Sequence, residues 1–256
     1  MYLGKKIIVV MPAYNAAKTV VRTVSEVVQQ GFVDEIILVD DCSHDATVQV
    51  AAALPGVRVH VHAQNTGYGG NQKTCYRLAL QAGADIVIMV HPDYQYTPTL
   101  MPVMVARIAK GESACVLGSR ILGGQALQGG MPVWKYVANR LLTLIENRLL
   151  GTRLSEYHTG YRAYSRALLE TLAWTNNSDG FLFDNQILAQ ILWHSFAISE
   201  VSCPTHYFKE ASSLNFPRSC RYGFGCLKVA MEFFLAKRGW AQPQWLLRAA
   251  TDPAKA

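Results

Sequence analysis

IIVVMPAYN, at residues 7–15, is an apolar run that ends in a polar turn. An apolar run without alternation is typical of a strand whose two faces are both covered. Valine then recurs at helical spacing over residues 17–30, which predicts a helix. Residues 35–39 predict a second strand, which is apolar from Ile36 onward and is followed by Asp40 and Asp41. Strand, helix and strand therefore follow one another at the start of the chain.

The same alternation continues along the sequence. Further strands are expected over residues 57–61, 86–90, 114–117, 161–164 and 198–201, and further helices over 46–53, 69–82, 100–109, 134–150, 182–193 and 222–238. Repeated alternation predicts an α/β fold with a Rossmann-like, mostly parallel sheet flanked by helices. The less regular second half predicts a C-terminal helical elaboration. We expect one domain over residues 1–241 and a loose tail over 242–256.

Composition restricts the classes of protein to which the chain can belong. Of its 256 residues, 50% are hydrophobic and 16% are charged, as in a globular protein. The net charge of +6 suits anionic ligands such as nucleotide phosphates or lipid headgroups. The sequence lacks the dense basic stripe that is typical of a nucleic-acid-binding protein. No apolar window is long enough to span a membrane, and residues 1–6 do not resemble a signal peptide. We therefore expect a cytoplasmic protein, soluble or bound to a membrane surface.

Polar side chains follow several of the predicted strands at the point where each strand ends. These side chains are Asn15, Asp40, Asp41, Asn65 and Asp93. In parallel sheets, ligands bind outside the carboxyl ends of the strands. Position alone therefore predicts one site that is built from all of these residues.

The acidic pair after the second strand and the glycine-rich segment NTGYGG (65–70) are the candidate nucleotide contacts. Asp40 and Asp41 repel each other, so they require donors such as a nucleobase N–H, a ribose hydroxyl or a metal. Asp45, by contrast, is expected to cap the next helix. The glycines allow close approach to a ligand and place a helix N-terminus near a phosphate, although many such loops are plain turns.

Asp93 is the candidate metal ligand, because Mg²⁺ and Mn²⁺ prefer oxygen ligands. A helix cap or a turn is the alternative. His91 is a second ligand, a phosphate donor or a packed side chain, and we favour a role other than ligation because imidazole suits Mg²⁺ poorly. His158 and His206 are weaker candidates for metal ligands in the second half.

Five short motifs follow one another in the order and spacing of one enzyme family. They are VVMPAYN (9–15), VDDCSHDAT (39–47), NTGYGG (65–70), GSR (118–120) and TGYR (159–162). On these motifs the chain resembles a family 2 glycosyltransferase of the GT-A fold over residues 7–209. The TGYR segment and the helix around Trp134 bring it nearest to the dolichyl- or polyprenyl-phosphate sugar synthases.

The resemblance implies a nucleotide-sugar-binding half over residues 1–120 and an acceptor-side half over 121–241. The donor base is implied to be uridine or guanosine. The residues implied to bind the donor nucleotide are Pro12, Ala13, Tyr14, Asn15, Asp40, Asp41, Asn65 and Gly67.

The resemblance also implies a divalent metal, Mg²⁺ or Mn²⁺, held by Asp93, the last carboxylate of the family's D-x-D motif. His91 stands where that motif has its first aspartate, and this departure weakens the expected metal binding. Arg162 closes the TGYR motif and is the strongest candidate to stabilise charge on the leaving diphosphate. The other residues implied to contact the sugar, the acceptor or the diphosphate are Gln95, Arg120, Glu156, Lys209, Arg218 and Arg221.

The implied reaction transfers a glycosyl group from a nucleotide diphosphate sugar to an acceptor, with inversion of configuration. Asp184 is either the general base for a hydroxyl acceptor or a cap of the helix that follows it. A phosphate acceptor would need no strong base. The candidate acceptors are a polyprenyl phosphate and another lipid- or glycan-linked group. The amphipathic helix over 222–238 either lies on an anionic membrane or packs as an ordinary core helix.

Two other functions stay open at this stage. A sugar nucleotidyltransferase usually carries a long glycine-rich loop with a basic signature after its first strand, and PAYN (12–15) does not supply one. A catalytically inactive protein that binds nucleotide sugars is compatible with His91 in place of the motif aspartate.

Overall fold

The computed structural model describes residues 1–204 and 216–247. His206 and Lys209, two of the residues singled out from the sequence, lie outside the described residues.

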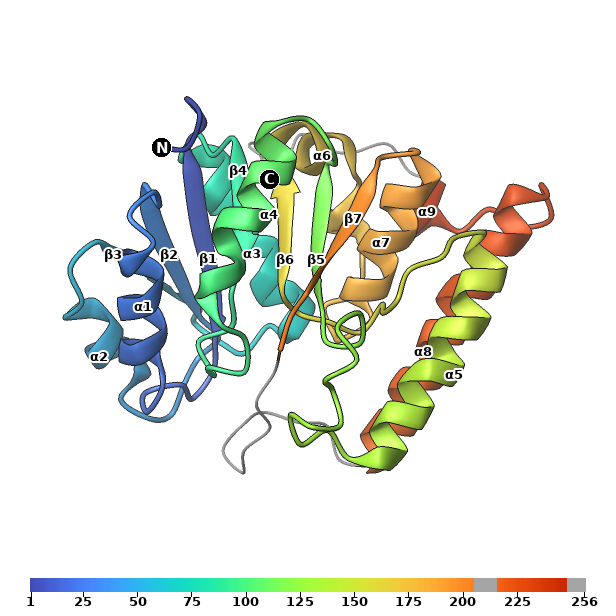
Figure 1. Cartoon of the computed structure of the whole chain (residues 1–256), viewed down its shortest axis with the longest axis horizontal. Coiled ribbons are helices and arrows are strands. Elements are labelled where there is room, and N and C mark those ends of the chain that lie inside the picture. Colours follow the sequence, from blue (N-terminus) through green and yellow to red (C-terminus); the bar gives the residue numbers. More distant parts are fainter. Residues whose placement is uncertain (205–215, 248–256) are drawn as a thin grey trace.

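A seven-stranded mixed sheet forms the centre of the protein (Figure 1). Its strands are β1 (Ile7–Ala13), β2 (Glu35–Asp40), β3 (Val57–Val61), β4 (Ile86–Met89), β5 (Cys115–Ser119), β6 (Arg162–Ser165) and β7 (Ile198–Ser202). Their order across the sheet is β3-β2-β1-β4-β6-β5-β7. Strand β6 runs antiparallel to both of its neighbours, β4 and β5, and the other pairs are parallel. The predicted α/β fold with a mostly parallel sheet is confirmed.

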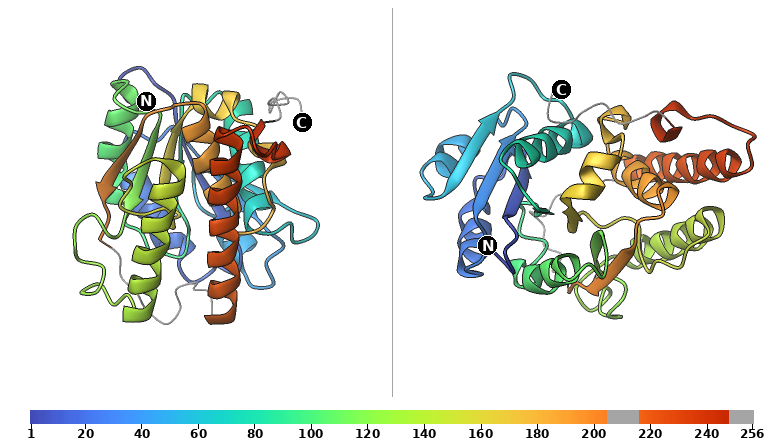
Figure 2. Two further views of the ribbon diagram at one scale, coloured as in Figure 1. Left: turned by 90° about the vertical axis from the view of Figure 1, so that its right-hand side faces the viewer. Right: turned by 90° about the horizontal axis from the view of Figure 1, so that it is seen from above.

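Helices cover both faces of this sheet (Figure 2). Helices α1, α2 and α4 cover one face, and α3, α6 and α7 cover the other. Short 3₁₀ turns lie at Pro98–Leu100 and Trp174–Asn176. The helices are α1 (Val20–Gln29), α2 (Thr47–Ala52), α3 (Tyr68–Gln81), α4 (Met101–Ala109), α5 (Val133–Leu150), α6 (Arg166–Thr171), α7 (Phe183–Trp193), α8 (Phe216–Lys237) and α9 (Gln244–Leu247).

Strand β1 shows why the first apolar run is unbroken. Ile8 and Val10 belong to the core that contains α3 and α7, whereas Ile7, Val9 and Met11 belong to the core that contains α1 and α4. Successive residues of a strand point to opposite faces, so a strand between two helical layers needs an apolar residue at every position. All five of these side chains are fully buried.

The C-terminal elaboration is a pair of long helices, α5 and α8, that lie side by side at one end of the sheet (Figures 1 and 2). The short helix α9 follows and is anchored rather than loose. The Trp245 indole N–H donates to Glu232 at 2.7 Å, and Gln190 donates to the Trp245 carbonyl at 2.6 Å. The prediction of a loose tail from residue 242 is therefore wrong for residues 244–247.

Candidate active site

Three non-glycine residues adopt the left-handed backbone conformation at the carboxyl edge of the sheet. Asn15, Cys42 and Tyr94 follow β1, β2 and β4 and have φ angles of 53°, 64° and 60°. Such conformations are unfavourable for residues with a Cβ atom, and they cluster at functional sites. This edge, which the sequence predicts as the site, thus holds a strained backbone after three adjacent strands.

Hydrogen bonds join the loops that follow β1 and β2. The Asn15 N–H donates to the Ser43 hydroxyl at 2.8 Å, and the Asn15 side-chain oxygen accepts from the His44 N–H at 2.9 Å. Tyr14 is half exposed and meets the His44 ring edge-on. The joined loops therefore present Tyr14 and Asn15 to the surface, whereas Pro12 and Ala13 are buried at the end of β1.

Asp40 and Asp41 obtain their hydrogen-bond donors from the protein itself. Asp40 is fully buried and accepts from the N–H and the hydroxyl of Ser43 at 2.8 and 2.5 Å. Asp41, 3% exposed, accepts from the N–H groups of Thr66 and Gly67 at 2.8 and 3.0 Å. The expectation that this pair requires an external donor is therefore wrong.

Asp41 also organises the loop that carries two of the predicted nucleotide contacts. His62 Nδ1 lies 2.8 Å from its carboxylate, and the Asn65 amide donates to its backbone carbonyl at 3.0 Å. Because Gly67 is bound through its own N–H, Asp41 fixes both ends of this short segment. His62 carries no signal in the sequence that would have linked it to this loop.

The glycines of NTGYGG allow helix α3 to pack against the segment before α7. A Cβ atom on Gly67 would lie 2.6 Å from the Asp179 carbonyl oxygen, and one on Gly69 would lie 2.3 Å from the Ser178 carbonyl oxygen. The N–H groups of Gly69 and Gly70 donate to the Asp179 carbonyl at 2.7 and 3.2 Å. These groups are not free for a ligand, so the expected phosphate contact at the start of α3 is wrong for Gly69 and Gly70.

A polar cluster connects β4, α3 and α7 at the same edge. The Tyr68 hydroxyl donates to Asp184 at 2.8 Å and lies 3.2 Å from His91 Nε2. Because the hydroxyl proton is used by Asp184, the Tyr68 oxygen accepts a hydrogen bond from His91, so Nε2 carries a proton. Burial and the neighbouring Asp184 charge raise the pKa of Tyr68 well above its usual value, which keeps this hydroxyl protonated.

The rings in this cluster are closely packed. Tyr68 stacks on His91 and on Phe181, with ring centroids 5.6 and 4.8 Å apart. A Cβ atom on Gly160 would lie only 2.6 Å from His91 Nε2, so the glycine of TGYR makes room for this histidine. The role of Tyr68 was missed from the sequence, although the residue stands within the NTGYGG motif.

Arg162 is fully buried, and its nitrogens bind backbone carbonyls. They donate to Tyr157, Thr159 and Asp184 at 3.0, 2.8 and 2.8 Å. Burial alone would lower the pKa of Arg162, but the Asp184 carboxylate raises it well above its usual value. The prediction that Arg162 contacts a leaving diphosphate is contradicted, because its donors join the segment before β6 to α7.

Comparison with known proteins identifies the family. The model of the Glycosyl transferase family 2 matches residues 8–173, which is more than half of the chain. The chain belongs to glycosyl transferase family 2. Membership of this family favours a glycosyltransferase over the sugar nucleotidyltransferase that the sequence left open.

This glycosyltransferase is similar in sequence to two sugar transferases whose names include a dolichyl or an undecaprenyl phosphate. It is 30% identical over 185 residues to UDP-N-acetylglucosamine–dolichyl-phosphate N-acetylglucosaminyltransferase of Methanococcus voltae, covering 66% of this chain and 73% of the relative. It is 29% identical over 171 residues to undecaprenyl-phosphate 4-deoxy-4-formamido-L-arabinose transferase of Pseudomonas aeruginosa, covering 64% and 48%.

The fold also matches solved structures. One is glucosyl-3-phosphoglycerate synthase from Mycobacterium tuberculosis in complex with Mn²⁺, uridine diphosphate and phosphoglyceric acid. The TM-score is 0.64 at 23% identity, with 93% of this chain and 80% of that chain covered. The likeness confirms the GT-A architecture of the glycosyltransferase.

Glu156 and Arg120 of the glycosyltransferase form an ion pair with each other. Glu156 is fully buried and accepts from the Arg120 guanidinium, from the Arg120 N–H at 2.8 Å and from Asn139 at 2.8 Å. Burial alone would raise the pKa of Glu156, but the charge and hydrogen bonds of Arg120 hold it below its usual value. The prediction that Glu156 contacts the acceptor or sugar is contradicted by this burial.

The remaining predicted contacts lie at the edge of the sheet or at the start of α8. Asp93 is half buried and accepts from the Gln95 N–H at 3.1 Å, in the loop that holds the strained Tyr94. Arg218 and Arg221 are exposed on the first turns of α8. This end of α8 adjoins the polar cluster, because Tyr222 donates to Asn185, the neighbour of Asp184, at 2.8 Å.

Proposed function

We propose that this glycosyltransferase moves a sugar from a uridine diphosphate sugar to a polyprenyl phosphate, with inversion at the anomeric carbon. The named relatives act on dolichyl and undecaprenyl phosphates, and a structural neighbour holds uridine diphosphate. The observation that carries the proposal is the position of Asp93 in the loop after β4, two residues from His91, which contacts Tyr68 and through it Asp184. Exposed Tyr14 and Asn15 lie on the same edge and provide donor contacts.

The residues at this edge fit a divalent cation. Mg²⁺ and Mn²⁺ are commonly held by one or two carboxylates, with phosphate oxygens and waters as the other ligands. Asp93 supplies one carboxylate, and His91 cannot use Nε2 because Tyr68 engages it. When bound, the cation would stabilise the negative charge that develops on the diphosphate.

The proposed chemistry is a displacement at the anomeric carbon. The bond from this carbon to the diphosphate oxygen breaks, and uridine diphosphate leaves with the electron pair. An oxygen of the acceptor phosphate forms the new bond from the opposite face. The acceptor oxygen is already an anion, so the step requires no proton transfer to a strong base.

The surroundings of Asp184 favour a phosphate acceptor over a hydroxyl acceptor. One oxygen of Asp184 accepts from Tyr68, and the other accepts from Gln72 at 3.2 Å and lies 3.7 Å from Arg162. A general base needs an oxygen that can take the proton of the acceptor hydroxyl. We therefore assign Asp184 the task of positioning Tyr68 and His91, and keep the base role only for a hydroxyl acceptor.

A face of the α5–α8 pair is suited to contact the membrane that carries such an acceptor. Helix α5 exposes Val133, Trp134, Val137, Leu141 and Leu144, which recur every three or four residues. The same helix carries Lys135, Arg140 and Arg148. An exposed apolar stripe on a helix that also carries cations is typical of a lipid interface. Within the described residues, no helix is sufficiently long and apolar to cross a bilayer.

Transfer assays with a panel of uridine and guanosine diphosphate sugars and a detergent-solubilised polyprenyl phosphate test the proposal. We expect Asp93→Ala to lower transfer by about 100-fold or more, since a cation at developing charge contributes several kcal/mol. Asp184→Asn should reduce transfer far less. Glu112→Ala, at an exposed carboxylate outside the edge, is the control.

Two results would overturn the proposal. One is transfer by Asp93→Ala at the rate of the Glu112→Ala control. The other is transfer to a hydroxyl acceptor but not to polyprenyl phosphate, with complete loss in Asp184→Asn, which would restore the base role of Asp184.

A further inference from the structure

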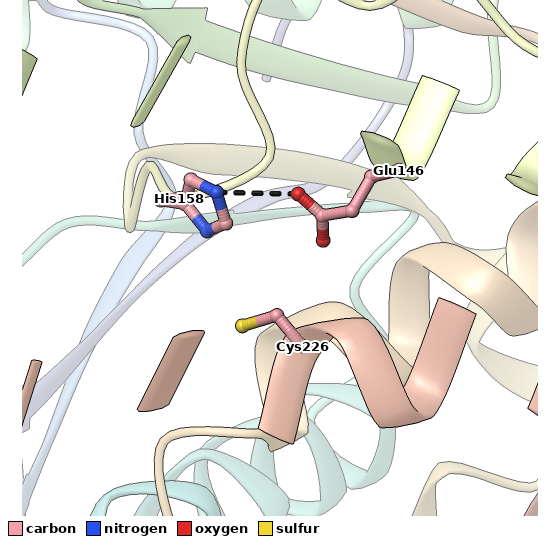
Figure 3. A group of neighbouring side chains, drawn as sticks. All are labelled: Glu146, His158 and Cys226. Atoms are coloured by element: carbon pink, nitrogen blue, oxygen red, sulfur yellow. Dashed lines mark ion pairs between the residues drawn. The ribbon is translucent and has the colours of Figure 1, made fainter. Parts of the chain in front are cut away.

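Three side chains from distant parts of the sequence meet between α5 and α8. Glu146 lies on α5, Cys226 on α8, and His158 in the segment before β6, and Figure 3 shows the three side chains converging. One carboxylate oxygen, one imidazole nitrogen and the sulfur all lie within 4.8 Å of one another. None of the three residues is used in the proposed transfer reaction.

A ring of hydrogen bonds orients the His158 side chain. Asn185 donates through its amide nitrogen to Glu146 Oε1 at 2.6 Å and accepts through its oxygen from Tyr222 at 2.8 Å. The Tyr222 hydroxyl proton is thereby used, so its oxygen accepts from His158 Nδ1 at 3.1 Å. Nδ1 therefore carries a proton, and Nε2 faces the carboxylate of Glu146.

The last side of this ring lacks a hydrogen bond. His158 Nε2 lies 3.2 Å from Glu146 Oε2, yet neither atom has a hydrogen-bond partner among the described residues. The two side chains are only 8% and 1% exposed. These two buried polar atoms point at the same place, and either a proton or a metal ion between them would satisfy both.

The geometry points to a zinc ion: we propose that Glu146, His158 and Cys226 bind Zn²⁺. Two nitrogen or oxygen ligands at about 2.0–2.1 Å from a tetrahedral Zn²⁺ lie about 3.3 Å apart, close to the separation of Nε2 and Oε2 here. Imidazole and thiolate ligands suit Zn²⁺, whereas Mg²⁺ and Mn²⁺ prefer oxygen. The carboxylate and the thiolate together neutralise the ion, as a buried site requires.

Zinc binding would displace the proton of Cys226. Burial, and then the charge of Glu146, raises the pKa of the Cys226 thiol well above its usual value, so the thiol is neutral when no metal is present. A coordinating thiol is deprotonated by the ion. Zinc affinity should therefore decrease as the pH falls.

The ion would join α5, α8 and the segment before β6, close to the carboxyl edge of the sheet. His158 is followed directly by Thr159 and by Gly160, the residue packed against His91. Tyr222 holds Nδ1 of His158 and so orients the ring for coordination through Nε2, as partners of metal-bound histidines commonly do. Bound zinc would thus hold the TGYR segment in place against His91.

Metal loading of the purified full-length chain tests this site without any nucleotide sugar, so its failure is separate from failure of the proposed function. The chain is stripped with a chelator, dialysed against Zn²⁺ or Mg²⁺, freed of excess metal and analysed by atomic emission. We expect about one Zn²⁺ per chain, and with Co²⁺ a thiolate-to-cobalt charge-transfer band in the near ultraviolet. Cys226→Ser should lose the band, whereas Cys220→Ser, at an exposed cysteine of the same helix, should keep it.

The wild-type cobalt spectrum needs no variant, so the test holds even where a variant folds poorly. Glu146→Gln, which preserves the size of the side chain, should also lose the bound zinc. Zn²⁺ but not Mg²⁺ should raise the melting temperature of the wild type and leave that of Cys226→Ser unchanged. Zinc content no higher than in the Mg²⁺-treated chain, or a cobalt band that persists in Cys226→Ser, would overturn the proposal.

Discussion

The hydroxyl of Tyr68 connects two residues that lie far apart in the sequence. It donates to Asp184 and accepts from His91, and the ring that carries it is stacked on His91 and Phe181. One oxygen atom thus determines the orientation of the histidine that replaces the first aspartate of the family's metal motif. At the scale of single residues, this hydroxyl is the most informative one to remove.

Tyr68→Phe should keep the stacked ring and lose both hydrogen bonds. A buried donor or acceptor left unpaired costs about 1–3 kcal/mol, so we expect transfer to decrease about 10-fold or more and the free energy of unfolding to decrease by a similar energy. Steady-state transfer kinetics and urea unfolding measure the two effects. Tyr161→Phe is the control, because the buried Tyr161 hydroxyl has no hydrogen-bond partner among the described residues. Equal losses in the two variants would contradict the assigned role.

Helix α3 and the segment before α7 form the closest contact between elements at the site. Gly69 lies against the Ser178 carbonyl and the Phe183 side chain, and Gly67 lies against the Asp179 carbonyl. Backbone atoms cannot move aside as a flexible side chain can. The contact therefore depends on the missing Cβ atoms, and it holds Tyr68 of α3 next to Asp184 of α7.

Gly69→Ala should separate α3 from this segment. Its Cβ atom would lie 2.3 Å from a carbonyl oxygen, so we expect a loss of about 2–3 kcal/mol in the free energy of unfolding and a loss of transfer. Gly180→Ala is the matched control on the same segment, since its Cβ would make an ordinary contact of 3.5 Å. Urea unfolding compares them, and a Gly69→Ala variant as stable as Gly180→Ala would show that the contact is not tight.

The ion pair of Arg120 and Glu156 joins the end of β5 to the segment before β6, and its effect on stability should depend on pH. The pKa of Glu156 in the folded protein lies below its usual value of 4.5 because of the Arg120 charge and hydrogen bonds. The carboxylate therefore contributes its stability above the unfolded pKa, and this contribution is lost as the pH falls through the folded value. Glu156→Gln should cost about 3 kcal/mol at pH 7, because it leaves a largely buried guanidinium without its charge partner.

Urea unfolding from pH 7 down to pH 3 measures this dependence, and the difference between wild type and Glu156→Gln should shrink below pH 4.5. Glu170→Gln is the control, because Glu170 is exposed and pairs with Arg166 four residues earlier. Its effect should stay below about 1 kcal/mol at every pH. A difference for Glu156→Gln that does not change with pH would contradict the assigned charge pairing.

For the whole molecule, the proposed membrane contact predicts which side of the protein meets lipid. Leu141 and Leu144 of α5 are more than half exposed, and burying a leucine in an apolar surrounding contributes about 1.5–3 kcal/mol. Leu141→Glu and Leu144→Glu should each weaken binding to vesicles containing anionic lipid by about 10-fold or more. Val28→Glu, at an equally exposed valine of α1, should leave binding unchanged.

Vesicle sedimentation measures this binding, and raising the salt concentration should weaken it because part of the attraction is electrostatic. If the wild type does not sediment with vesicles, or if Val28→Glu reduces binding as much as Leu141→Glu does, the α5 face is not the membrane contact.

Much of the fold is predictable from the sequence, because strands covered on both faces need unbroken apolar runs and helices need apolar residues at helical spacing. Strands β1 to β4 and the helices between them match their predicted ranges within a few residues. The short helices α6 and α9 were not predicted from the sequence. Asp45 accepts from the Thr47 N–H at the start of α2, as its capping pattern predicts.

The layered α/β architecture, the edge at which polar residues gather and the family could all be predicted from the sequence, because they depend on local periodicity and on the order of short motifs. The contacts in the folded chain, by contrast, show that Arg162 and Glu156 pair inside the protein with Asp184 and Arg120 respectively. They also show that the glycines of NTGYGG face protein backbone and that β6 enters the sheet between β4 and β5. The sequence alone does not show whether a charged residue or a glycine contacts a ligand or a distant segment of the same chain. The difference is set by which segments fold against it.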